Sequence, residues 1–144
     1  MSEHPWLESL IAMFCRPGGA GAGGEELARV HIAWELRSGQ WVFIRDDVGI
    51  LAWASYWLTD DNGLQRIRTE SFSEIVHSGM LIPLTHGPRA YVATAVVAPG
   101  APHATYRLLY RLLMREVAAM GAKTISAHLV KRDGRRFWHE RSLK

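Results

Sequence analysis

The sequence predicts an α/β (α+β) fold in one domain, 1–144, with a mixed, mostly antiparallel sheet and a parallel strand-helix-strand crossover at residues 91–130. An apolar run rich in Val and Ala is followed by a helical pattern and a second strand pattern, the order typical of a parallel crossover. Two aromatic-rich runs before it are separated by turn residues, as in an antiparallel hairpin. A chain of 144 residues is long enough to bury one hydrophobic core.

The N-terminal part contains two helix patterns around a loop. Pro5 suits a first helical turn, and the apolar residues after it recur at helical spacing, which predicts a helix over 5–15. Residues 17–24 are almost only Gly and Ala and predict a flexible loop. Residues 25–37 fit a helix that ends at Gly39, although they also alternate as a strand would, and we prefer the helix.

The middle of the chain predicts a hairpin. Residues 40–45 and 49–58 are aromatic and branched runs that should pair antiparallel across an Asp-Asp-Val-Gly turn. We expect the run Thr-Asp-Asp-Asn-Gly at 59–63 to form the next turn. A serine followed three positions later by a glutamate at 71–74 resembles a capping box and predicts a short helix there.

The C-terminal part supplies the crossover. Residues 81–89 hold two prolines and a glycine and predict a loop, whereas 91–98 are continuously apolar, which predicts a central strand buried on both faces. A helix should run from residue 103 or 104 to 120, and a strand should follow over 124–130. An Asp-Gly turn then predicts a last hairpin arm over 135–141.

Composition narrows the function classes. Cys15 is the only cysteine, which excludes an internal disulfide and predicts a reducing, cytoplasmic location. No apolar run is long enough to span a membrane. The formal net charge is +3, but basic residues gather in the last third of the chain. Such a region suits a cofactor phosphate, an acyl carrier protein or another acidic protein, or nucleic acid, or it forms a solvated surface.

The order of these elements resembles the core of the GCN5-related N-acetyltransferase (GNAT) superfamily. The resemblance implies a GNAT-like domain in which the loop after the central strand binds the pyrophosphate of coenzyme A at a helix N-terminus. Pro99 and Pro102 lack N–H groups in that loop. The residues that the resemblance assigns to cofactor binding are Ala98, Gly100, Ala101, Ala104, Thr105 and Arg107.

A narrower similarity concerns the toxin-activating lysine acyltransferases, which move an acyl group from acyl carrier protein to a protein lysine. The segments Gly39-Gln40-Trp41, Gly49 to Trp57 and Val97-Ala98-Pro99-Gly100 resemble that branch's motifs, in the same order. The branch is expected to use a histidine about twenty residues before the first motif and an aspartate before the last. Here the first region contains no histidine, and the aspartate position falls on Ala95, or Thr94 with a shift of one.

Three histidines are candidate catalytic groups. His103 lies at the junction of the loop and the helix, where it could act as a base or hydrogen-bond donor, or simply cap the helix. His128 should face the groove beside the central strand, or be a satisfied structural histidine. His31 and Glu35 would share a helix face as base and orienting group, or as an exposed ion pair, which we favour. For Cys15 we expect a buried helix-end thiol.

The first hypothesis is an acyltransferase-like protein that moves an acyl group from an acyl thioester, on acyl carrier protein or CoA, to an amine, in particular a protein lysine. Two alternatives stay open: a non-catalytic GNAT-fold binding or assembly protein, and a nucleic-acid-directed modifier that uses Arg132, Arg135 and Arg136. We expect no permanently bound cofactor and no metal, because no His and carboxylate set has ligand spacing. The tryptophans at 41, 53 and 57 suit an acyl or base-stacking surface, a core, or an association face such as that of a homodimer.

Overall fold

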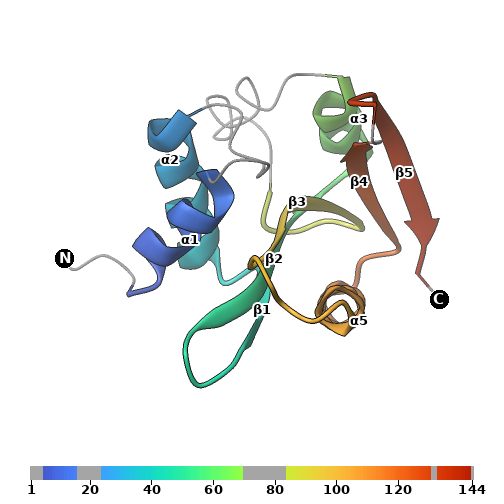
Figure 1. The fold of residues 1–144 in the computed structure, drawn as a ribbon. Coiled ribbons are helices and arrows are strands. Elements are labelled where there is room, and N and C mark those ends of the chain that lie inside the picture. Colours follow the sequence, from blue (N-terminus) through green and yellow to red (C-terminus); the bar gives the residue numbers. More distant parts are fainter. Residues whose placement is uncertain (1–4, 16–23, 70–83, 131–132, 144) are drawn as a thin grey trace. The chain divides into compact units, whose positions relative to one another are not determined.

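Figure 1 shows the protein in a computed structural model that describes residues 5–15, 24–69, 84–130 and 133–143. Five strands form one sheet in the order β1-β2-β3-β4-β5. The elements are α1 (Leu7–Cys15), α2 (Gly24–Ser38), β1 (Trp41–Arg45), β2 (Ile50–Thr59), α3 (Asp61–Thr69), β3 (Arg89–Val97), α5 (Ala104–Ala119), β4 (Thr124–Val130) and β5 (Arg136–Ser142).

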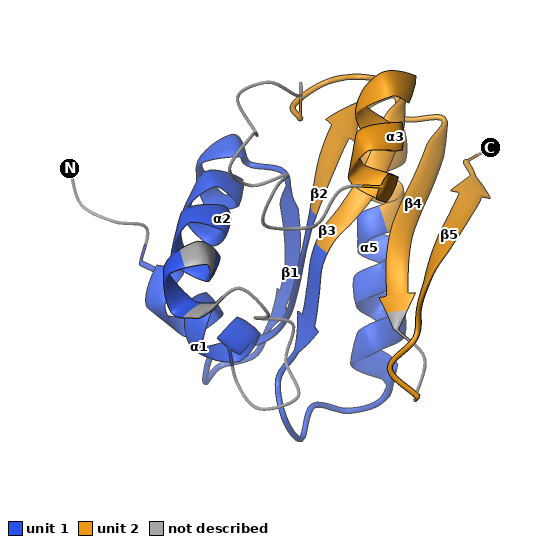
Figure 2. Cartoon of the chain, turned by 90° about the horizontal axis from the view of Figure 1, so that it is seen from above, with its two compact units in different colours: residues 1–55, 94–113 blue, residues 56–93, 114–144 orange. Residues whose placement is uncertain are grey.

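The strand pairing confirms the predicted mixed sheet. β1 pairs antiparallel with β2, β3 pairs parallel with β4, and β4 pairs antiparallel with β5. α5 connects β3 to β4, so the predicted crossover is confirmed. The chain groups into two compact units, unit 1 with residues 1–55 and 94–113 and unit 2 with residues 56–93 and 114–144 (Figure 2). The assignment of the whole chain to one domain stays a prediction.

The core of unit 1 is built from the apolar faces of α1 and α2. Leucine, isoleucine and phenylalanine side chains recur three and four residues apart on α1, so one stripe of the helix is apolar and becomes buried. Full burial of each such side chain stabilises the fold by roughly 1.5–3 kcal/mol. The buried members of this cluster are Leu7, Leu10, Ile11, Phe14, Ala28, Ile32, Leu36, Trp53 and Val96.

The helix over 25–37 is confirmed, but the face that it buries differs from the expected one. The helical spacing of Leu27, Val30, Ala33 and Trp34 predicts that these four share the apolar face, yet Val30 is exposed. The buried stripe contains Ala28, Ile32 and Leu36 instead. Successive residues lie about 100° apart around an α-helix. A stripe displaced by one or two positions along the sequence therefore turns a different set of side chains toward the core.

The turn expected at residues 59–63 is wrong, because α3 begins there. The N–H of Gly63 donates to Asp60 Oδ1 at 2.8 Å, which makes Asp60 the N-cap of α3. Asp, Asn and Gly favour turns and helix caps alike, so the local composition did not distinguish the two. The helix predicted from 71–74, part of the loop over 81–89 and all but one residue of the loop over 17–24 lie outside the described residues.

Two burial predictions are also corrected. β3 is not buried on both faces, since the side chain of Ala95 is exposed, whereas β2 is buried along its last eight residues. The continuous apolar run therefore predicted the strand correctly, but it did not predict how much of the strand is buried. Cys15 is exposed rather than buried. No helix in the described part of the chain is long and apolar enough to cross a membrane.

Candidate functional site

The loop after β3 is hydrogen-bonded to β2 at its start, and most of its later residues are exposed. The N–H of Ala98 donates to the carbonyl of Leu51 at 2.7 Å, which ties the start of the loop to β2. Gly100 has φ +80°, a left-handed conformation that favours glycine. The N–H of Ala101 donates back to the carbonyl of Ala98 at 3.2 Å, which closes a tight turn.

Several backbone N–H groups at the start of α5 are not used by the fold. The N–H groups of Thr105 and Tyr106 donate to loop carbonyls at 2.9 and 3.3 Å. Those of Gly100, His103 and Ala104 have no acceptor among the described residues. Unused N–H groups and the helix dipole together favour an anion at such a position.

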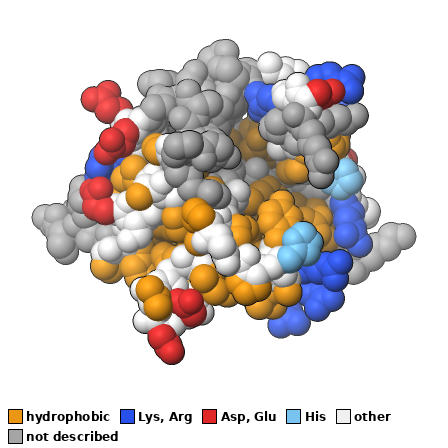
Figure 3. All heavy atoms as spheres, viewed as in Figure 1, with side chains coloured by type: hydrophobic (Ala, Val, Ile, Leu, Met, Phe, Trp, Pro, Cys, Tyr) orange, Lys and Arg blue, Asp and Glu red, His pale blue; other side chains and the backbone are white. Residues whose placement is uncertain are grey.

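The residues present therefore fit a phosphate group, although two prolines reduce the number of donors. A Cβ added to Gly100 would meet no atom within 4 Å, so its backbone is open to approach. Arg107 is exposed one turn into α5. Figure 3 shows that several Lys and Arg side chains gather on part of the face in view. Of the six predicted cofactor-binding residues, Gly100, Ala104 and Arg107 offer free groups, whereas the N–H groups of the other three serve the loop itself.

His31, Glu35 and Thr94 form a buried polar cluster in unit 1. His31 Nε2 lies 2.9 Å from Glu35 Oε1 and 2.7 Å from Thr94 Oγ1. The three residues are 2%, 0% and 3% exposed. The predicted exposed pair is therefore wrong, because the α2 face that carries His31 and Glu35 is the one turned toward the core. The pairing of the two side chains is present.

This cluster is costly to bury, which makes it a functional candidate. A separation of 2.9 Å between Nε2 and a carboxylate oxygen requires a proton between them, and Nε2–H can donate to Glu35. Glu35 Oε2 is buried without a hydrogen-bond partner in the part of the chain that the structure describes. Buried acid–base pairs with an unsatisfied atom cost stability, so their presence points to a role beyond packing.

The carboxylate of this cluster comes from α2 and not from the central strand. The position at which the lysine acyltransferases are expected to carry aspartate falls on Ala95 or Thr94. Ala95 is exposed, whereas Thr94 contributes its hydroxyl to the cluster. Glu35, one helical turn after His31, takes the place beside the imidazole.

The other two predicted histidines lie in different surroundings. His103 is exposed at the end of the loop. In unit 2, His128 Nε2 lies 3.3 Å from the carbonyl oxygen of Arg68, which can only accept, so this nitrogen carries the proton. The Tyr91 hydroxyl then donates to Nδ1 at 2.9 Å. Because both ring nitrogens are engaged, His128 serves the packing of unit 2 in this arrangement.

An aromatic stack surrounds His128 and was not predicted. Trp138 on β5 lies opposite His128 in the strand register and stacks on Tyr91, with ring centroids 5.9 Å apart and an interplanar angle of 11°. Burial lowers the pKa of His128, and the charge of Arg136 lowers it further, against the hydrogen bond to Arg68. The sequence predicts the hairpin of 124–130 and 135–141, and the register of that hairpin places Trp138 opposite His128.

The buried hydroxyl of Tyr91 should make stability depend on pH. Burial raises the pKa of Tyr91 to about 12, against an opposing effect of Arg136. A raised pKa in the folded state gives stability that is complete below the unfolded value of about 10 and is lost as the pH rises through 12. We expect Tyr91→Phe to remove up to about 2 kcal/mol of this alkaline loss, measured by urea unfolding at several pH values.

The matched control for this titration is Tyr110→Phe, because Tyr110 is 36% exposed on α5. That variant should keep the alkaline loss of the parent protein. An unchanged pH profile for Tyr91→Phe would show that the Tyr91 hydroxyl does not carry the effect.

The three arginines proposed to bind nucleic acid differ in their surroundings. Arg135 pairs with Asp133 of its own hairpin at 2.7 Å, which reduces its local charge. Arg136 is exposed, and Arg132 lies outside the described residues.

Comparison with known proteins identifies the class of fold. No protein-family model matches the chain, and no curated protein is similar to it in sequence. Among solved structures, the GphF GNAT-like decarboxylase in complex with isobutyryl-CoA matches with a TM-score of 0.68 and 13% identity, over 89% of this chain and 63% of that chain. The loading GNATL domain of CurA from Lyngbya majuscula matches with a TM-score of 0.66 and 13% identity, over 89% and 62%.

A third similar structure is the mosquito arylalkylamine N-acetyltransferase like 5b, with a TM-score of 0.53 and 12% identity, over 92% of this chain and 76% of that chain. The chain therefore has a GNAT-like fold, as the order of its elements predicts. It spans less than two thirds of the first two structures. At these identities the similarity concerns the fold, and the activity has to be argued from the residues of this chain.

Proposed function

We propose that the protein binds an acyl thioester at the loop over 98–105 and transfers the acyl group to an amine, in particular a protein lysine. The observation that carries this proposal is the set of three unused N–H groups, from Gly100, His103 and Ala104, at the start of α5 in a GNAT-like fold. GphF, with a similar fold, was solved with isobutyryl-CoA, which supports a CoA-type donor. Acyl carrier protein is the other donor that supplies the same chemistry.

The phosphate of either donor would be held by backbone and side chain together. The N–H groups and the N-terminal dipole of α5 favour a negative charge. Arg107 adds a guanidinium that can bind two phosphate oxygens at once. This arrangement needs no specific side chain in the loop itself, so it accommodates Pro99 and Pro102.

The transfer step needs a group that accepts a proton. The amine nitrogen attacks the thioester carbon and loses a proton, while the carbon–sulfur bond breaks and the sulfur leaves as a thiolate, which takes a proton from solvent to become the free thiol. We assign this proton to the His31–Glu35 pair, in which the Nε2–H of His31 orients the carboxylate. Because the pair is buried, the proton would reach Glu35 Oε1 through the hydroxyl of Thr94, which donates to that oxygen at 3.5 Å and lies on β3 about 13 Å before Ala98 along the strand.

Donor binding is tested by calorimetry and thermal shift with acetyl-CoA, octanoyl-CoA and octanoyl acyl carrier protein. A donor present at 100 times its dissociation constant should stabilise the folded state by about 2.7 kcal/mol. Stabilisation by only one donor type identifies the physiological class. If neither CoA thioesters nor acyl carrier protein stabilise the protein, the proposal is wrong.

Gly100→Ala should weaken donor binding at least tenfold, since a methyl group would cover the backbone N–H and a left-handed φ is unfavourable for alanine. The matched control is Gly134→Ala, in the β4–β5 turn. Gly134 also has a left-handed φ, of +86°, and open space around an added Cβ. Both variants should lose similar stability, but only Gly100→Ala should lose donor affinity.

Arg107 is tested in the same assay. Arg107→Gln should weaken binding and reduce its dependence on salt, because one ion pair with phosphate is lost. Arg37→Gln, which removes an exposed charge on α2, is the control and should bind as the parent does.

A second function is favoured by the burial of His31, which is only 2% exposed. A GNAT-fold protein whose acid–base pair is buried away from the substrate would bind the thioester without turnover, as a binding or assembly protein. Donor binding without release of thiol, in the presence of lysine peptides and small amines, would support this alternative over the acyltransferase.

A further inference from the structure

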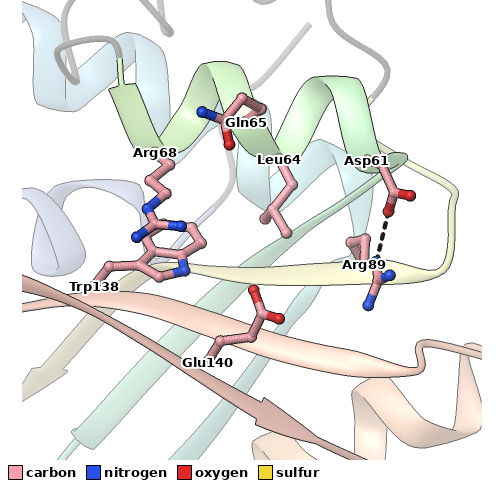
Figure 4. Close-up of a pocket in the computed structure, with 7 residues that line it drawn as sticks. All are labelled: Asp61, Leu64, Gln65, Arg68, Arg89, Trp138 and Glu140. Carbon is pink, nitrogen blue, oxygen red and sulfur yellow. Dashed lines mark hydrogen bonds and ion pairs between the residues drawn. The ribbon is translucent and has the colours of Figure 1, made fainter.

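Unit 2 contains a small polar pocket between α3, β3 and β5, with a volume of about 190 Å³ (Figure 4). This volume corresponds to roughly six water molecules, which is the size of a small metabolite. Residues that line the pocket include Asp61, Leu64, Arg68, Arg89, Trp138 and Glu140.

Arg68 is positioned by an aromatic ring and, among the described residues, not by hydrogen bonds from its guanidinium. Its guanidinium lies over the ring of Trp138, 5.5 Å from the ring centroid, and Trp138 stacks on Tyr91 on β3. No described residue accepts a hydrogen bond from the guanidinium of Arg68. A stacked guanidinium with free donors is prepared to bind a carboxylate or phosphate through two parallel hydrogen bonds.

Glu140 provides the opposite charge in the same pocket. Its Oε1 accepts a hydrogen bond from Ser126 at 3.3 Å, and in the described part of the chain no cation lies within ion-pair distance of its carboxylate. Asp61 and Arg89, in contrast, already pair with each other at 2.7 Å. Among the described residues, Arg68 and Glu140 thus form no ion pair, although the charge of Glu140 acts on Arg89, and the four charges of the pocket sum to zero.

We propose that this pocket binds a small zwitterion, an α-amino acid with a short apolar side chain. The carboxylate of the ligand would pair with Arg68 and its ammonium group with Glu140, while Leu64 contacts the side chain. A ligand with only one charge leaves a pocket charge without a partner. The inference concerns unit 2 alone and does not depend on acyl transfer.

The experiment titrates the full chain with L-alanine, N-acetyl-L-alanine and L-alaninamide, followed by NMR and calorimetry. L-alanine should bind with a dissociation constant on the order of 1 mM, and each derivative, which lacks one charge, should bind at least tenfold more weakly. Arg68→Gln and Glu140→Gln should each weaken L-alanine binding at least tenfold. Arg111→Gln and Glu26→Gln, exposed charges that do not line the pocket, should leave it unchanged.

Circular dichroism confirms that each variant is folded before its affinity is compared. Equal binding of L-alanine and N-acetyl-L-alanine would overturn the proposal, because the ammonium group would then have no role. The absence of L-alanine binding up to about 10 mM would overturn it as well, since that limit lies well above the expected constant.

Discussion

Replacing His31 by leucine is expected to lower the free energy of unfolding by about 3–5 kcal/mol, measured by urea unfolding. His31 Nε2 lies 2.9 Å from the Glu35 carboxylate, and Glu35 is fully buried. Without the imidazole, the Thr94 hydroxyl, at 3.5 Å, is the one side chain among the described residues that still hydrogen-bonds to that carboxylate. A buried carboxylate without a close partner is among the most destabilising changes in a protein core.

The control is the double variant His31→Leu/Glu35→Leu, which removes both polar groups together. Apolar replacement of a whole buried pair is often neutral or stabilising, so we expect the double variant to recover most of the lost stability. Glu35→Leu alone should cost less than His31→Leu, because a neutral imidazole keeps its contact with Thr94 at 2.7 Å. If His31→Leu is as stable as the parent, the pair does not carry the buried charge that we assign to it.

The same double variant is expected to reduce the rate of acyl transfer by a factor of about 10²–10⁴. Among the described residues, no other proton acceptor is shown beside Thr94, so the amine would more often stay protonated and unable to attack. The dissociation constant of the donor should not change, since the loop over 98–105 is untouched. The measurement is release of free thiol from the acyl donor that binds, with an excess of lysine peptide.

Thr94→Val separates the proton route from the stability of the cluster. Valine keeps the shape of threonine and removes the hydroxyl through which we route the proton. The rate should fall in this variant while the donor still binds. Full activity of Thr94→Val would exclude the route through the hydroxyl, and full activity of the double variant would exclude the His31–Glu35 pair as the proton acceptor.

Only some features of the candidate site could be predicted from the sequence. The spacing of His31 and Glu35 predicts that they meet on a helix, and the structure confirms this contact. Their burial could not be predicted, because α2 carries two overlapping apolar stripes and only tertiary packing selects one. The loop after β3 was recognisable from its turn residues, but which N–H groups stay free depends on the internal hydrogen bonds of the loop.

The sequence by itself determined the local elements of this protein and their order. Helical spacing, branched runs and turn residues act within a few positions, so the hairpin of β1 and β2, the β3-α5-β4 crossover and the last hairpin follow from them. Only the tertiary structure decided which distant side chains meet. Thr94 contacts His31 across 63 positions, and Trp138 contacts both Tyr91 and Arg68. Such contacts depend on strand neighbours and helix rotation, which no local pattern specifies.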